Sequence, residues 1–313
     1  MEKNIERIVK SCLERNPCDL DIRYGEPVAD HCTFKVGGPA DCFLRPSGDG
    51  LPAFAAALLA RARAEGVPLF ILGGGANIVV ADSGVRGIVL DMGGWIGKAR
   101  HGEKRLRFRS GTSLDEAVEV AASAGLSGME FLAGMPGSIG GAVWMNARCY
   151  GKEVSDLLDE TEVIDFSRYV PEQFRLPTDP REFGYKRSPF QSRRMLILSA
   201  LFRLESREIG SIRAEMDRYR RDREDKGHYN FPSAGSVFKN NPAFGKPTGK
   251  IIDELGLRGQ RIGGAQVAPW HGNMIVNTGG ATAADIHALT EELAAKVKSA
   301  TGFDLEPEII FVS

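Results

Sequence analysis

The stretch FPSAGSVFKNN, residues 231–241, gathers polar side chains that no apolar period explains. As an acyl-transfer nucleophile, Ser236 would need a base and a G-x-S-x-G turn, but the local sequence A-G-S-V-F lacks the second glycine. His228 and His271 could be bases, although their spacing favours neither. A turn serine and a serine that acts on a ligand therefore both stay open, and Asn240 offers an amide beside it.

Two glycine-rich segments offer backbone N–H groups. LGGGAN at 72–77 follows a short apolar run, and GMPGSIGGAVWMN at 134–146 carries four glycines and no charge. Such turns can bind phosphate oxygens. The first is neither a Rossmann fingerprint nor a Walker loop, because no G-x-G-x-x-G opens a helix there and no lysine follows. Each segment could be a structural turn, but two in one chain favour a bound dinucleotide.

Composition excludes several classes of protein. The 313 residues are 42% hydrophobic and 26% charged, with a net charge of −1, which points to neither nucleic acid nor an anionic membrane. Five cysteines without a CxxC pair argue against a disulfide framework and a zinc site. The amphipathic N-terminus has no apolar h-region, so we expect a surface helix and a cytoplasmic protein.

The elements that must position these residues follow from periodicity and caps. Helices are expected over 51–65, from Ser113 to near Gly125, along a charged stretch after about 205, over 249–256, and from Thr282 to Gly302. Strands are expected at 67–72, 78–82, 87–92, 105–110, 160–166, 195–204, 263–268, 273–278 and 305–312. The order lacks strict βαβ alternation and predicts an α+β protein in two units.

Seven motifs, in the same order, resemble the UDP-N-acetylenolpyruvoylglucosamine reductase family over most of the chain. They are TFKVGGPAD, LGGGANIVVADSGVRGIVL, GMEFLAGMPGSIGGAVWMNA, FGYKRSPFQ, PSAGSVFKN, GGAQVAPWHGNMIVN and LEPEIIF. The compact region between 145 and 190 is similar to the shorter subtype, which lacks an extra tyrosine-bearing loop.

The resemblance implies a fold and a reaction. It implies an FAD-binding domain of the vanillyl-alcohol-oxidase type over 1–205, split into two subdomains near 95–105, and an α+β substrate-binding domain over 206–313. It implies FAD as cofactor, NADPH as co-substrate, and reduction of UDP-N-acetylglucosamine enolpyruvate to UDP-N-acetylmuramate for peptidoglycan. A cytoplasmic monomer without metal, nucleic-acid or membrane partner is expected.

The resemblance also assigns residues. Those expected at the FAD are Thr33, Phe34, Leu72, Gly73, Gly74, Gly75, Ala76, Asn77, Gly134, Pro136, Gly137, Ser138, Gly140, Gly141, Ala142 and Asn146. Those expected at the substrate are Tyr185, Lys226, Asn240 and Gln266. Because no protein side chain accepts a hydride reversibly, a cofactor must do so.

Hydride addition to the enol ether leaves negative charge on the neighbouring carbon and its carboxylate. That charge needs a positioned cation or acid, and the carbon needs a proton. By resemblance, Ser236 is the proton donor and Glu308 helps to polarise the enolate.

The sequence departs from the family pattern at the assisting arginine. FGYKRSPFQ places Lys186 where the arginine of Y-R-x-S is expected, with Arg187 one step on. In an extended segment these two side chains would point to opposite faces, so we favour Lys186. A local backbone shift that brings in Arg187 is the alternative.

Two further departures are Arg148-Cys149, in place of small residues, and Gly227-His228, in place of Gln-Pro. Two other functions therefore stay open: another FAD-dependent oxidoreductase on the same scaffold, or a non-catalytic nucleotide-sugar-binding relative.

Overall fold

The computed structural model describes residues 2–313, which divide by their contacts into two compact units. The first unit holds the residues up to Gly25, Asp41–Gly74 and Gly87–Arg221, and the second holds Glu26–Ala40, Gly75–Arg86 and Asp222–Ser313. The expected domain boundary at 205/206 stays a prediction. By contacts, the first unit ends at Arg221, near the end of a helix, and the second unit includes the early segments Glu26–Ala40 and Gly75–Arg86.

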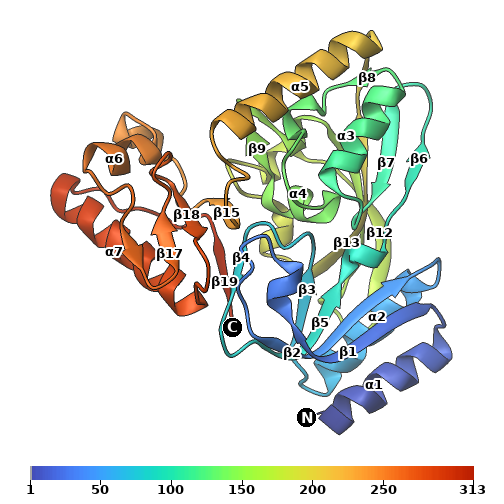
Figure 1. The fold of residues 1–313 in the computed structure, drawn as a ribbon. Coiled ribbons are helices and arrows are strands. Elements are labelled where there is room, and N and C mark those ends of the chain that lie inside the picture. The colour runs from blue at the N-terminus through green and yellow to red at the C-terminus, as the bar shows by residue number, and fades with distance from the viewer. Residues whose placement is uncertain (1) are drawn as a thin grey trace. The chain divides into compact units, whose positions relative to one another are not determined.

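The first unit is built around two sheets with helices packed on them (Figure 1). A four-stranded sheet has the order β1-β2-β5-β3, and an antiparallel five-stranded sheet has the order β12-β11-β13-β7-β6. Their strands are β1 (Asp19–Pro27), β2 (Pro39–Ser47), β3 (Leu69–Leu72), β5 (Val85–Asp91), β6 (Lys98–Arg100), β7 (Arg105–Arg109), β11 (Leu158–Asp165), β12 (Glu172–Pro177) and β13 (Met195–Arg203).

Helices and short pairs complete this unit. The helices are α1 (Glu2–Arg15), α2 (Leu51–Ala64), α3 (Leu114–Ser123), α4 (Ile139–Met145) and α5 (Ile209–Asp225). The short strands are β8 (Leu126–Ser127), which pairs with β14 (Glu205–Ser206), and β9 (Arg148–Cys149), which pairs with β10 (Lys152–Glu153). The packing of α4 on β13 and β7 matters most, because this short helix carries glycine-loop residues at one end.

The second unit is a smaller α+β assembly. Its antiparallel sheet has the order β15-β18-β17-β16, and a parallel pair joins β19 to β4. The elements are β4 (Ile78–Val80), β15 (Ser233–Ser236), α6 (Thr248–Glu254), β16 (Arg261–Ile262), β17 (Ala265–Val267), β18 (Met274–Asn277), α7 (Ala283–Thr301) and β19 (Ile310–Val312). Helix α7 packs against β16 and β17 (Figure 1).

Local chemistry explains where α7 begins and ends. Thr282 and Asp285 form the expected capping box, and Gly302 ends the helix with a φ of 76°. The carboxylate of Asp82 also accepts the backbone N–H groups of Ala283 and Ala284, at 2.8 and 3.0 Å. The early segment 75–86 is thereby fixed to the C-terminal helix within the second unit.

The last strand is shorter than expected. Only Ile310–Val312 forms β19, although a strand over the whole of 305–312 was predicted, and that longer extent is wrong. Pro307 instead forms an isolated bridge with Phe238. Among residues 2–313, the structure has no helix with the length and apolarity needed to cross a membrane.

Candidate functional site

The two glycine segments approach each other closely within the first unit. Gly73 and Gly74 follow β3, and Gly137 lies just before α4. A Cβ placed on Gly74 would lie 2.6 Å from the Cα of Gly137, which is closer than real Cβ atoms come to backbone. Only a residue without a side chain fits at this point, so Gly74 is required for the contact between the loops.

Ser138 holds the two loops together. Its hydroxyl oxygen accepts the N–H of Gly74 at 3.2 Å and the N–H of Gly141 at 3.3 Å. The second bond caps α4, and the first ties this cap to the loop after β3. Gly140 donates its N–H to the Ser110 carbonyl at 2.8 Å and leaves no space for a side chain, since its Cβ would meet that of Ser110 at 2.8 Å.

These loops suit a diphosphate chemically. They present backbone groups, and the segment 134–146 carries no charged side chain. Leu72 and Ala142, two of the predicted cofactor residues, are only 2% and 6% exposed. They can contact a cofactor only through backbone atoms. Gly134 has a φ of 71° and donates its N–H to the carboxylate of Asp115. Pro136 lies between Gly134 and Gly137 in the same loop.

The segment at Lys186 is a tight turn, and the extended conformation that we expected is wrong. Gly184 and Arg187 exchange two backbone hydrogen bonds of 3.0 Å, with Tyr185 and Lys186 between them. Lys186 has a φ of 55°, a left-handed conformation that costs free energy for a residue with a Cβ. The alternation that favoured Lys186 over Arg187 therefore does not apply here, and the choice between them stays a prediction.

The Tyr185 ring lies beside a second cation of the first unit. The guanidinium carbon of Arg148 is 5.3 Å from the centroid of that ring, a cation–π contact. Arg148 is one of the departures from the family pattern, and its position gives it a local partner. The phenol ring is 36% exposed, so a ligand can still reach it.

In the second unit, the structure brings Ser236 and Glu308 side by side. Ser236 is the last residue of β15, and the N–H of Glu308 donates to the carbonyl of Val237 at 2.7 Å. The bridge between Phe238 and Pro307 continues this pairing. Two residues that lie far apart in the sequence therefore occupy neighbouring backbone positions.

The segment 75–77 belongs to the same part of the second unit. The side-chain amide of Asn77 donates to the carbonyl of Glu308 at 3.0 Å. The N–H of Thr33 donates to the carbonyl of Gly75 at 3.0 Å, and its hydroxyl donates to the carbonyl of Ser233 at 2.7 Å. Ala76 lies between Gly75 and Asn77. The strand that carries Ser236 and the segment that carries Glu308 are both bonded to this group.

Phe34 is placed differently from its neighbour Thr33. Its side chain is fully buried in the core of the second unit, and its carbonyl accepts the amide of Asn277 at 3.2 Å. Any contact of Phe34 with a ligand must therefore go through its backbone.

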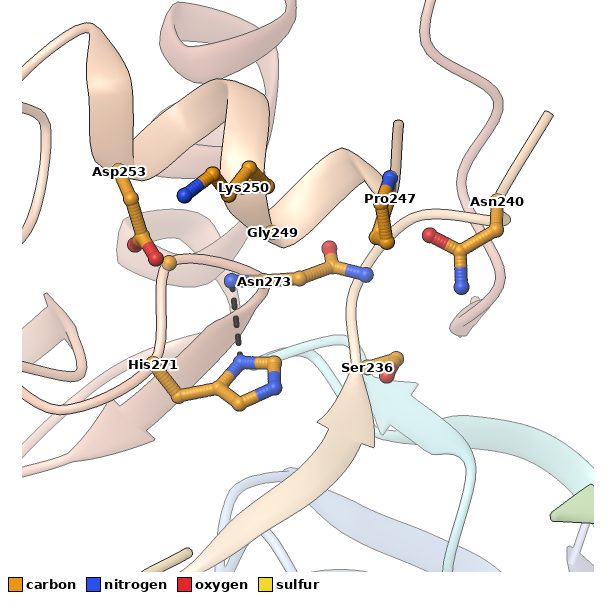
Figure 2. Close-up of a pocket in the computed structure, with 9 residues that line it drawn as sticks. Ser236, Asn240, Pro247, Gly249, Lys250, Asp253, His271 and Asn273 are labelled. Atoms are coloured by element: carbon orange, nitrogen blue, oxygen red, sulfur yellow. Dashed lines mark hydrogen bonds between the residues drawn. The ribbon is translucent and has the colours of Figure 1, made fainter. Parts of the chain in front are cut away.

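A cavity of about 200 Å³ opens beside Ser236 in the second unit (Figure 2). Its lining is formed by Ser236, Asn240, Pro247, Gly249, Lys250, Asp253, His271, Gly272 and Asn273. The imidazole of His271 points toward Ser236, and its Nδ1 accepts the backbone N–H of Asn273 at 3.2 Å. That bond leaves Nε2 as the donor of the neutral ring. Burial lowers the pKa of His271, which favours this neutral form.

His228, the other candidate base, lies 6.2 Å from His271 between ring centroids. Burial, followed by the charge of Arg223, lowers the pKa of His228 to about 4. His228 is therefore neutral near pH 7. Within residues 2–313, no hydrogen bond joins either histidine to the Ser236 hydroxyl, as a nucleophile–base pair would need.

The predicted substrate residues of the second unit fall into two groups. Asn240 lines the cavity, and its amide oxygen accepts the N–H of Thr248 at 2.9 Å. Lys226 lies outside the cavity lining, and its ammonium pairs with Asp222 at 2.7 Å. Gln266 is on β17 and donates to the carbonyl of Gly259 at 3.1 Å. Only Asn240 of these three is placed with Ser236.

Sequence reasoning did not single out Lys250, Asp253 or Asn273, which line the cavity with Ser236. Lys250 and Asp253 lie on α6, where their spacing matches an ordinary amphipathic helix. Asn273 is buried and donates its amide to the carbonyl of Phe238 at 2.8 Å. No local pattern marks these residues, because the pairing of β15 with β18 brings Asn273 to Ser236 and the position of α6 brings Lys250 and Asp253 to the same cavity.

Comparisons with known proteins agree with this arrangement. Residues 53–167 match the family model described as "FAD binding domain", and residues 227–312 match "UDP-N-acetylenolpyruvoylglucosamine reductase, C-terminal domain". The UDP-N-acetylenolpyruvoylglucosamine reductase of Treponema denticola is 39% identical over 93% of each chain. That of Borreliella burgdorferi is 38% identical over 91% of this chain and 92% of its own.

A solved structure shows the same fold. The crystal structure of UDP-N-acetylenolpyruvylglucosamine reductase from Thermus caldophilus is 32% identical, with a TM-score of 0.74. The match covers 95% of this chain and 100% of that one. The α+β fold with an FAD-binding part and the resemblance noted from the motifs are both confirmed. The chain belongs to the UDP-N-acetylenolpyruvoylglucosamine reductase family.

Proposed function

We propose that this enzyme reduces UDP-N-acetylglucosamine enolpyruvate to UDP-N-acetylmuramate with NADPH, in peptidoglycan precursor synthesis. The observation that carries the proposal is the placement of Ser236 at a cavity, with Glu308 bonded through its backbone to the next residue, Val237, in a chain of this family. The same chemistry connects the enzyme to cell shape and division, and we propose that it acts as a monomer in the cytoplasm. No observation favours another flavin-dependent oxidoreductase or a non-catalytic relative.

The cofactor of this family fits the loops of the first unit. Gly73, Gly137 and Ser138 would offer backbone N–H groups to its diphosphate, whereas the N–H of Gly74 donates to the Ser138 hydroxyl and holds the loops together. We further propose Thr33, Gly75, Ala76 and Asn77 as cofactor contacts, because they lie in the family motifs TFKVGGPAD and LGGGANIVVADSGVRGIVL. When bound, FAD supplies the hydride acceptor and donor that protein side chains lack.

Ser236 has the position and chemistry of a proton donor to the substrate carbon. A hydroxyl that only donates a proton needs no histidine partner and forms no covalent bond, unlike a nucleophilic serine. Glu308, whose backbone is bonded to Val237, would act on the same enolate. Gly235, with a φ of 75° and open space around its Cα, lets the chain bend beside Ser236.

Lys186 would supply the positive charge that stabilises the enolate. Its ammonium keeps the charge of the arginine usual in the family but lacks the two-pronged geometry of a guanidinium. The left-handed φ of Lys186 supports this role, since strained conformations are kept where function needs them. Tyr185 and Asn240 are proposed substrate contacts, with Lys226 and Gln266 as the weaker candidates in view of their positions.

The reaction itself can be tested directly. Purified protein with bound flavin should oxidise NADPH only when UDP-N-acetylglucosamine enolpyruvate is present, and should form UDP-N-acetylmuramate in equal amount. Absorbance of NADPH and mass spectrometry of the nucleotide measure this. NADPH oxidation at the same rate with and without the enolpyruvyl nucleotide would indicate another oxidoreductase. A folded protein that contains no flavin would indicate a binding protein.

Ser236→Ala should separate the two halves of the reaction. Reduction of bound flavin by NADPH should keep its normal rate, because Ser236 takes no part in it. Oxidation of that flavin by the enolpyruvyl nucleotide should fall by at least about a hundredfold, the usual contribution of a general acid. Stopped-flow absorbance of the flavin measures both steps. Reoxidation near the normal rate would return Ser236 to the role of a turn residue.

The choice between Lys186 and Arg187 has its own test. Lys186→Ala and Lys186→Gly should both lose turnover while flavin stays bound, and Arg187→Ala should not. Lys186→Gly should also raise the free energy of unfolding by roughly 0.5–1 kcal/mol over Lys186→Ala, because glycine adopts a positive φ without strain. Denaturant unfolding measures that difference. Loss of turnover in Arg187→Ala alone would assign the role to Arg187.

A further inference from the structure

The side chain of Asn146 is hydrogen-bonded at both ends inside the first unit. Asn146 is 0% exposed and has a left-handed backbone, with a φ of 46°. Its amide nitrogen donates to the carbonyl of Gly184 at 2.9 Å, and its amide oxygen accepts the N–H of Ser155 at 3.0 Å. A buried amide with both ends bonded holds its partners in one geometry. One of those partners is the first residue of the turn that carries Lys186.

The end of α4 makes further bonds to the same segment. The hydroxyl of Ser188 donates to the carbonyl of Trp144 at 2.5 Å, and the amide of Gln191 donates to the carbonyl of Lys186 at 3.1 Å. The bonds of Asn146 and Ser188 thus flank the turn on its two sides. Such support is what a strained residue needs, because Lys186 would otherwise relax to a negative φ.

Helix α4 connects this turn to the glycine loops. Ser138 precedes the helix, and its hydroxyl accepts a hydrogen bond from the N–H of Gly74. Asn146 follows the helix, and its amide donates a hydrogen bond to the carbonyl of Gly184. Seven helical residues span roughly 10 Å at about 1.5 Å per residue. A short rigid element therefore sets the distance between the loops and the lysine, all within the first unit.

We propose that Asn146 is a positioning residue, which fixes the 184–187 turn and thereby places Lys186 for the reaction. This inference rests on the proposed function, and it differs from the cofactor contact that the sequence suggested for Asn146. In this role Asn146 acts through the carbonyl of Gly184 and not by contact with substrate or cofactor. Removing its amide should loosen the turn and leave the glycine loops intact.

The first test measures the turn itself in the flavin-bound protein. Asn146→Gly keeps the left-handed backbone without strain and removes the amide, and Asn146→Asp keeps the size and the acceptor for Ser155 but loses the donor. In both variants the N–H of Arg187, bonded to Gly184, should exchange with solvent about tenfold faster, the effect of losing one hydrogen bond. Ser155→Ala is the matched control. It removes a hydroxyl that donates to Glu153 and keeps the backbone N–H that donates to Asn146, so it should leave this exchange unchanged.

The second test asks whether Asn146 acts through Lys186. Asn146→Gly should slow oxidation of the flavin by the enolpyruvyl nucleotide about tenfold, with flavin content and reduction by NADPH unchanged. In a Lys186→Ala background the same change should have less than about a twofold effect, because residues that act as a unit are not additive. A general structural defect would give equal effects in both backgrounds.

The outcomes separate this inference from the proposed function. Unchanged exchange at Arg187, additive kinetic effects, or loss of flavin with normal reoxidation would each overturn the positioning role of Asn146. A wild-type protein that is not oxidised by the enolpyruvyl nucleotide would overturn the proposed function instead. In that case faster exchange at Arg187 would still show that Asn146 holds the turn, although not for this reaction.

Discussion

The close approach of Gly74 to Gly137 is the constraint on which the first unit depends. Backbone meets backbone there, so Gly74 leaves no room for a side chain at the contact, and Gly137 has a φ of 131°, which residues with a side chain rarely adopt. Ser138 bonds the two loops with one hydroxyl and at the same time caps α4. The direction of α4 follows from this cap, and the position of the 184–187 turn follows from the other end of α4. The contact between Gly74 and Gly137 thus determines, through α4, where Lys186 lies.

In the second unit, backbone pairing brings the candidate residues together. Its reactive candidates, Ser236 and Glu308, come from distant parts of the chain and meet through one short ladder. Asn77 donates a hydrogen bond to the carbonyl of Glu308, and Thr33 donates one to the carbonyl of Ser233. The early residues of the second unit therefore support its C-terminal strands. Polar side chains therefore have two functions here: some hold strands together, and others face the cavity.

Sequence reasoning worked where the determining chemistry is local. The capping box at Thr282, the helix end at Gly302 and the strands over 195–204 and 273–278 follow from caps and periodicity, and the structure has them. The motifs also identified the family. Local patterns could not reveal which glycines touch, or that Lys250 and Asp253 line a cavity with Ser236, because both depend on how distant segments pack together. The turn at Lys186 was missed because lysine rarely adopts a positive φ, so nothing in FGYKRSPFQ signals it.

The central claim, that the contact between the glycine loops forms the cofactor site, is tested most directly by Gly74→Ala. The affinity of the folded protein for FAD, measured by fluorescence titration, should fall by at least about tenfold, because the added methyl group must push the loops apart. Gly210→Ala is the control, since the atoms nearest its added methyl group would belong to the exposed Glu208 carboxylate at the start of α5, and its FAD affinity should be normal. A folded Gly74→Ala protein that binds FAD as tightly as the wild type would contradict the account.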